Sequence, residues 1–145
     1  MGTRTVLMRT IIVVAALAAV IALADCDALG NRASLDGTAW RLTGWAVNSL
    51  DPQGFTITAE FDDGNIGGTS AVNSYGGEYR TGPGNDFSVG EIAQTLIAGP
   101  EADMRAETAY LELLRAAASY RLNGTTLTLY DDAGNESLIF TATAR

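Results

Sequence analysis

Ile66-Gly-Gly-Thr-Ser-Ala-Val-Asn-Ser-Tyr-Gly-Gly-Glu-Tyr79 is the stretch that decides the fold. Two glycine pairs, Gly67-Gly68 and Gly76-Gly77, stand on either side of Asn73 and Tyr75. Glycine inside a strand pattern marks a bulge or a close approach of two backbones. We therefore interpret the stretch as one bulged structural strand.

The residues before this stretch predict its strand partner. Apolar side chains at Phe55, Ile57, Ala59 and Phe61 alternate with polar ones, which is the period of a strand with one buried face. Asp-Asp-Gly-Asn at 62–65 then favours a tight reversal. The chain is expected to return antiparallel.

Further upstream, Trp40 and Leu42 share one face of a predicted first strand. This alternation favours a buried core tryptophan at position 40 over an exposed ligand-binding one. Residues 46–54 are expected to form a loop.

One helix is predicted downstream, after a short strand at Phe87 and Val89. It begins at Pro100, in the first helical position, and reaches about Ala118. Its spacing predicts a buried stripe and a solvent face. The stripe contains Met104, Leu111, Leu114 and Ala118, and the solvent face contains Arg105, Glu107, Glu112 and Arg115.

The C-terminal part of the sequence predicts β-strands. Asn123-Gly124 is a strong two-residue hairpin turn, followed by strands at 125–130 and 136–143. The order of elements predicts a mainly β fold with one helix (α+β). We expect a small antiparallel β-barrel-like or strongly curved sheet covered by the single helix.

The first 25 residues are interpreted as an export signal. Arg4 and Arg9 precede an apolar run from Ile11 to Ala24, which is shorter than the roughly 20 residues that span a bilayer as a helix. Residues 26–34 are then a polar tether, and 35–145 the folded domain.

Cys26 is the predicted lipidation site. Leu23-Ala24-Asp25-Cys26 is similar to a lipoprotein processing site, although Asp25 stands where a small residue is expected. Cleavage after Ala24 to release a secreted soluble protein, or an uncleaved anchor, are the alternatives. The solitary cysteine favours lipidation, because no second thiol in the chain can pair with it.

The composition disfavours many functions. The chain has nine Arg, no Lys and no His, against 17 acids, and from Cys26 onward its net charge is −9. This excess repels nucleic acid. Without His, Lys or a cysteine in the folded part, common nucleophile pairs and soft metal sites are excluded. We expect no catalytic residues, no metal and no cofactor.

Some carboxylate chemistry remains as an alternative. Ser70 or Ser74 with an acid could form a hydrolytic site, although no base of the usual type is present. The acids near Asn65 and Asn135 could bind a hard cation, but their spacing lacks a full calcium loop. Turn stabilisation is the preferred interpretation of these acids.

An ordered set of motifs spans residues 35–143. It contains Leu35-Asp36-Gly37-Thr38-x-Trp40, Phe61-Asp62-Asp63-Gly64, Gly68-x-Ser70-x-x-Asn73-x-Tyr75-x-Gly77-x-Tyr79, Thr95 before the helix, Glu107 with Leu111 and Leu114, and Leu127-x-Leu129 with Gly134. This set resembles the META domain of HslJ-like bacterial envelope proteins.

The resemblance implies a small β-barrel-like fold with a helix, often on a lipoprotein linked to envelope stress or antibiotic tolerance. It supplies structural signature residues, Trp40, Gly68, Asn73, Tyr75 and Thr95, and no catalytic ones. It also implies a cysteine pair that this chain replaces by Val72 and Gly99. The domain is therefore expected to be disulfide-free.

These observations together predict a non-enzymatic, membrane-anchored envelope protein that binds another protein or a small apolar ligand. A secreted, lipocalin-like ligand-binding barrel and a carboxylate-dependent hydrolase are the alternatives.

Overall fold

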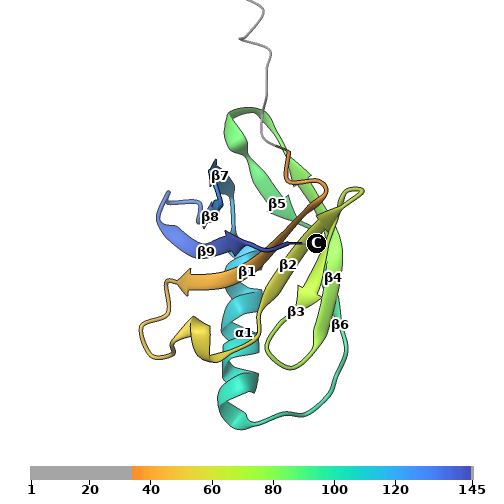
Figure 1. Ribbon diagram of the computed structural model, residues 1–145, viewed down its shortest axis with the longest axis vertical. Helices are drawn as coiled ribbons and strands as arrows, with labels where there is room; N and C mark the ends of the chain where they lie inside the picture. Colours follow the sequence, from red (N-terminus) through yellow and green to blue (C-terminus); the bar gives the residue numbers. More distant parts are fainter. Residues whose placement is uncertain (1–33, 145) are drawn as a thin grey trace, which may run out of the picture. The chain divides into compact units, whose positions relative to one another are not determined.

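The computed structural model describes residues 34–144 of the chain (Figure 1). The predicted signal, Cys26 and all of the predicted tether before Ser34 lie outside these residues. The strands are β1 (Thr38–Trp45), β2 (Thr58–Asp62), β3 (Asn65–Thr69), β4 (Ser74–Thr81), β5 (Phe87–Val89), β6 (Ala93–Gln94), β7 (Ser119–Asn123), β8 (Thr126–Tyr130) and β9 (Glu136–Ala142). One α-helix, α1 (Glu101–Ala116), and two 3-10 turns, η1 (Pro52–Gly54) and η2 (Pro83–Asn85), complete the described part.

The strands form one antiparallel sheet that nearly closes on itself. The order is β5-β4-β3-β2-β1-β9-β8-β7, and the short β6 pairs with β4. The two end strands, β5 and β7, approach each other. The Phe87 N–H donates to the Ala118 carbonyl (2.9 Å), and the main chains of Asp86 and Ser119 form an isolated antiparallel β-bridge. The predicted mainly β, barrel-like fold with a single helix is thus confirmed.

Aromatic side chains occupy the interior. Phe61, Tyr79, Phe87 and Tyr120 form one series of ring contacts, with centroids 4.9–6.4 Å apart. Tyr110 of α1 contacts Tyr75 of β4 at 5.5 Å and Phe140 of β9 at 6.4 Å. The helix therefore packs on the sheet through a ring inserted between two strands.

Several local predictions are confirmed. Ile57, Ala59 and Phe61 are fully buried, and Trp40 is 4% exposed. The Asn123-Gly124 turn joins β7 to β8, with Gly124 at φ 59°.

The predicted single bulged strand at 66–79 is wrong. This stretch is a hairpin: β3, a turn at residues 70–73, and β4. One glycine pair lies opposite in its ladder, Gly67 with Gly76, whereas Gly77 pairs with Ile66 and Gly68 with Tyr75. Gly68 and Gly77 allow neighbouring backbone to approach the hairpin, at the Thr58 and Glu91 carbonyls, and the reversal itself occurs at residues that carry no glycine.

The helix prediction is correct in position and wrong for part of its buried face. Leu111 and Leu114 are buried as expected, whereas Met104 is only half-buried and Ala118 lies beyond the helix end. Glu107, predicted to face solvent, is buried. Pro100 precedes the first helical residue instead of occupying that position.

Gly68 should be intolerant of any side chain. A Cβ at this position would lie 2.3 Å from the Thr58 carbonyl oxygen, which is backbone and cannot move away. We expect Gly68→Ala to lower the free energy of unfolding by about 2–3 kcal/mol in chemical denaturation. Gly54→Ala is the matched control, because a Cβ there meets nothing within 4 Å. Equal effects of the two substitutions would contradict the steric argument.

Candidate functional site

The turn between β3 and β4 is held in an unusual conformation. The Ser70 N–H donates to the Asn73 carbonyl at 2.8 Å, which closes the turn. Within it, Ala71 adopts a φ of 82°, a left-handed conformation that alanine rarely adopts. Since the sequence Ser-Ala-Val-Asn has no intrinsic preference for this shape, contacts from elsewhere in the chain must maintain it.

Glu107 of α1 supplies those contacts. Its Oε2 accepts hydrogen bonds from the Asn73 N–H (2.7 Å) and the Ser70 hydroxyl (2.8 Å). Its Oε1 accepts one from Asn73 Nδ2 at 2.8 Å. The side chain is only 2% exposed.

The charge state of Glu107 follows from these bonds. Burial by itself would raise the pKa of the carboxyl, but the backbone and side-chain hydrogen bonds from Asn73, with that from Ser70, lower it below its ordinary value. Glu107 is therefore a carboxylate at neutral pH and acts as an acceptor only.

The Asn73 side chain links this carboxylate to a third segment. Its Oδ1 accepts hydrogen bonds from the Thr95 hydroxyl and the Ile97 N–H, both at 2.7 Å. Its Nδ2 donates to the Ile97 carbonyl at 3.1 Å as well as to Glu107. The primary amide thus uses both donors and both acceptor positions.

These contacts define what we call the Asn73 node: Ser70, Asn73, Thr95 and Glu107, with the main chain of Ile97. It joins the β3–β4 turn, the loop before α1 and the helix itself. The turn and the loop before α1 are also close at Val72, because a Cβ built on Gly99 would lie 2.7 Å from Val72 Cγ2.

The predicted signature residues divide between this node and the core. Asn73 and Thr95 belong to the node. Tyr75 is buried beneath it, donating to the Thr58 carbonyl (2.9 Å) and lying 2.6 Å from the Tyr110 hydroxyl. Trp40 stands apart on β1, where its indole N–H donates to Thr38 Oγ1 at 2.7 Å.

The tyrosine pair is not poised for proton transfer. Burial raises the pKa of Tyr75 and of Tyr110 well above the ordinary range for tyrosine. Both rings are at most 5% exposed, so no substrate reaches them from solvent. We assign the pair to structure.

Ser70 is likewise unsuited to catalysis. Its hydroxyl lies 2.8 Å from a carboxylate, which is the distance a nucleophile and its base would need. However, Ser70 is completely buried, and Glu107 is occupied by two further donors. The hydroxyl therefore stabilises the turn.

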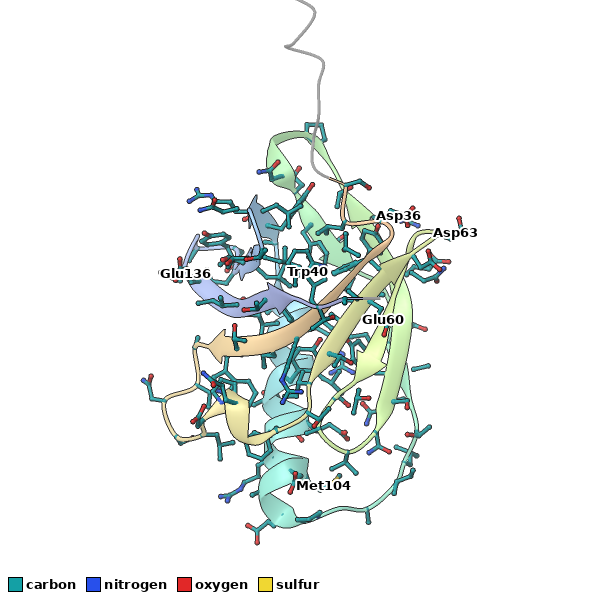
Figure 2. The ribbon with its side chains drawn as sticks, in the orientation of Figure 1. Asp36, Trp40, Glu60, Asp63, Met104 and Glu136 are labelled. Atoms are coloured by element: carbon teal, nitrogen blue, oxygen red, sulfur yellow. The ribbon has the colours of Figure 1, made fainter. Side chains whose placement is uncertain are left out.

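The exposed acids are distributed over separate turns and strands. Figure 2 shows Asp36 and Asp63 at one side of the view and Glu136 at the other. Among residues 34–144, no three His, Cys, Asp or Glu side chains gather into a metal-binding group. Likewise, none of the helices in this part is long and apolar enough to cross a membrane.

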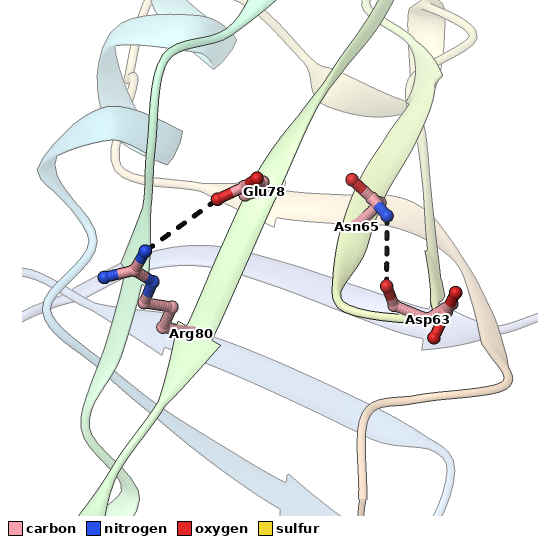
Figure 3. A network of polar contacts seen from close by, with 4 residues as sticks. All are labelled: Asp63, Asn65, Glu78 and Arg80. Atoms are coloured by element: carbon pink, nitrogen blue, oxygen red, sulfur yellow. Dashed lines mark hydrogen bonds and ion pairs between the residues drawn. The ribbon is translucent and has the colours of Figure 1, made fainter.

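The predicted turn stabilisation by an acid is found at Asp131, whereas at the other turn the Asn65 side chain supplies the bond. Asn65 Nδ2 donates to the Asp63 carbonyl at 3.0 Å, near an exposed Arg80–Glu78 ion pair of 3.8 Å (Figure 3). Asp131 accepts from the Asn135 N–H at 2.8 Å and from its side chain at 3.1 Å. Such local bonds are ordinary Asx-turn chemistry.

Sequence reasoning missed the position of Glu107 and the role of the loop before α1. A signal for Glu107 was present, because it stands four residues before Leu111 and seven before Leu114, on their side of the helix. No comparable signal indicated that Asn73 would bond the main chain of Ile97.

Comparisons with known proteins give a family for the chain and structures that share its fold. The family model described as META domain matches residues 33–144. An NMR structure of a protein from Burkholderia xenovorans is similar at 28% identity and a TM-score of 0.61, covering 77% of this chain and 85% of that one. No curated protein matches the chain.

A more distant structure shares the fold alone. A crystal structure of a DUF4847-family protein from Bacteroides vulgatus has 12% identity and a TM-score of 0.54, covering 77% of this chain and 96% of that one. At this identity the likeness carries no information on function.

Glu107→Gln should destabilise the domain. In the wild type, Ser70 and Asn73 donate to both carboxylate oxygens of Glu107. Glutamine replaces one of these oxygens by an NH₂ group, so at least one buried donor loses its acceptor. We expect a loss of about 2–3 kcal/mol in the free energy of unfolding at neutral pH. Glu112→Gln, at an exposed position of the same helix, is the control and should change stability by less than about 0.5 kcal/mol.

The difference between wild type and Glu107→Gln should depend on pH. Because the pKa of Glu107 in the folded state lies below its ordinary value of 4.5, its stabilisation is fully present above that value. It is lost as the pH falls through the folded-state pKa. The two stability curves should therefore converge on acidification, and a constant gap across the acid range would refute the assignment.

Val72 and Gly99 should accept an engineered disulfide. An ideal Cβ on Gly99 lies 3.5 Å from Val72 Cβ, within the usual range for a disulfide of roughly 3.5–4.5 Å. In a Cys26→Ala background, we expect oxidised Val72→Cys/Gly99→Cys to gain about 2–4 kcal/mol over its reduced form. Mass spectrometry and denaturation with and without reductant measure this, and failure to oxidise would contradict the geometry.

Proposed function

The chain belongs to the META domain family, and on this premise we propose that it is a non-enzymatic binding protein of the bacterial cell envelope. It is held at the membrane by a lipid on Cys26 and contributes to envelope stress responses or antibiotic tolerance. Its partner is another envelope protein or a small apolar ligand.

The observation that carries the non-enzymatic assignment is the burial of Glu107. This carboxylate accepts three hydrogen bonds from within the fold and is 2% exposed, so a substrate proton has no access to it from solvent. A residue of the type that catalysis uses is here committed to joining segments of the fold.

The hydrolase alternative finds little support. It needs two carboxylates in one cleft, and the acids described above are either buried in the Asn73 node, as Glu107 is, or spread over separate turns, strands and the helix surface. Asp131, for example, is occupied by three donors within its own turn, from Ala133 and Asn135.

The lipocalin-like alternative needs an apolar interior cavity. In this barrel the interior positions carry aromatic rings in mutual contact, from Phe61 to Tyr120 and from Tyr75 to Phe140. A barrel filled by its own side chains favours binding at the outer surface.

The envelope location rests on the sequence. An apolar segment preceded by Arg4 and Arg9 is followed by Asp25 and a single cysteine, and seven residues separate that cysteine from Ser34, where the described part begins. Such a spacing suits a folded domain attached by a short tether to a lipid-bearing residue.

Lipid attachment can be tested directly. In cells producing the full chain and fed a palmitate analogue, we expect the protein to carry the label and to fractionate with membranes. Cys26→Ala should abolish both, because the thiol that receives the lipid is missing. A known lipoprotein in the same cells serves as the positive control.

Two results would overturn the tether. An unlabelled wild-type protein beside a labelled control lipoprotein would show that Cys26 is not modified. Release of wild-type protein into the soluble fraction, with a new N-terminus at Asp25, would favour the secreted alternative.

A further inference from the structure

Two large apolar side chains are exposed next to each other in the loop between β6 and α1. Leu96 is 89% exposed and Ile97 is 61% exposed. Ala98 and Pro100 beside them are exposed as well. Single apolar side chains at a surface are ordinary, but adjacent ones at one loop tip create an apolar patch that water solvates poorly.

This loop is fixed to the domain at the exposed residue itself. Asn73 binds both main-chain groups of Ile97, its N–H at 2.7 Å and its carbonyl at 3.1 Å. Thr95 is bound on the other side, because its N–H donates to the Ser74 carbonyl and its hydroxyl receives the Ser74 N–H. The two apolar side chains are therefore presented on a fixed backbone, which lowers the entropy lost when a partner covers them.

Charge around the loop selects the kind of partner. From Glu91 to Met104 the chain beside the loop has three carboxylates and no basic residue, and exposed Arg105 follows. Two of them, Glu101 and Asp103, lie in the first turn of α1, directly after the loop. An apolar tip with an acidic rim is complementary to an apolar pocket with a basic rim.

The same charges disfavour two other occupants. Anionic lipid repels an acidic rim, so a membrane surface is a poor partner. In a symmetric contact between two copies through this loop, Glu101 and Asp103 of both copies would be brought into one interface, which is also repulsive.

The location of the loop agrees with a protein partner. Figure 1 shows the β6–α1 connection at the end of the domain opposite the point where the chain enters β1. Met104, in the first turn of α1, marks this end in Figure 2. At that end the loop is clear of the entry into β1, so a protein partner can reach it.

We propose that Leu96 and Ile97 anchor a docking surface for a second envelope protein whose apolar pocket is flanked by Lys or Arg. This inference rests on the proposed envelope function and adds the site and the chemistry of the partner. The Asn73 node then has a second consequence beyond stability, since it holds the anchor residues in place.

Site-specific crosslinking tests the proposal with the full chain in its native cells. A photoreactive benzoyl-phenylalanine replaces Leu96 in one variant and Asp132, on the exposed β8–β9 turn, in the control. We expect a discrete adduct with one other protein from position 96 and none from position 132. Ile97→Asp in the position-96 variant should abolish the adduct without changing thermal unfolding, because Ile97 is exposed.

The captured protein is then identified by mass spectrometry, purified and titrated. We expect Ile97→Asp to weaken its binding by roughly tenfold or more, as for an interface anchor. Binding of the wild type should also weaken as salt is raised, because the rim charges are screened. Binding that is unchanged by Ile97→Asp would overturn the assignment.

The other outcomes also decide the matter. An adduct of two copies of this chain, an adduct with phospholipid alone, or no adduct would each overturn the proposal. Palmitate-analogue labelling of the same cells distinguishes failure of the docking proposal from failure of the proposed envelope function. Label without an adduct refutes only the docking surface, whereas an adduct without label refutes only the lipid tether.

Discussion

The fold depends on the buried carboxylate of Glu107, whose hydrogen-bond donors, Ser70 and Asn73, are uncharged. Removing a charge from water is costly, and Glu107 is tolerated because three donors replace its hydration. The donors gain equally, since the Asn73 N–H and amide would otherwise be buried without an acceptor. This mutual dependence fixes the β3–β4 turn, the loop before α1 and the helix as one unit.

Elements governed by local chemistry could be predicted from the sequence. The alternation at Ile57, Ala59 and Phe61 and the Asn123-Gly124 turn need no information from distant residues, and both are as predicted. The overall arrangement also followed, because short antiparallel connections with one helix leave few ways to bury an apolar face.

The site could be predicted only in part, because its geometry comes from distant contacts. The turn at residues 70–73 lacks the Gly, Pro or Asx-Gly signals that mark a reversal, and Glu107 stabilises it from 34 to 37 positions away. A carboxylate in a helix is normally placed in solvent, and here satisfied hydrogen bonds outweigh that preference. The resemblance supplied Asn73 and Thr95 as signature residues, but the loop that they hold became evident only in three dimensions.

The contact between Val72 and Gly99 has a consequence for how the protein matures. The branched side chain of Val72 fills the space that a Cβ at position 99 would need, so packing and the hydrogen bonds of the Asn73 node connect the turn to the segment before the helix without a covalent link. With a single cysteine in the sequence, outside the barrel, no internal disulfide has to be formed or rearranged. The barrel can therefore reach its final structure independently of thiol oxidases, and changes in the redox state of its surroundings leave its internal connections intact.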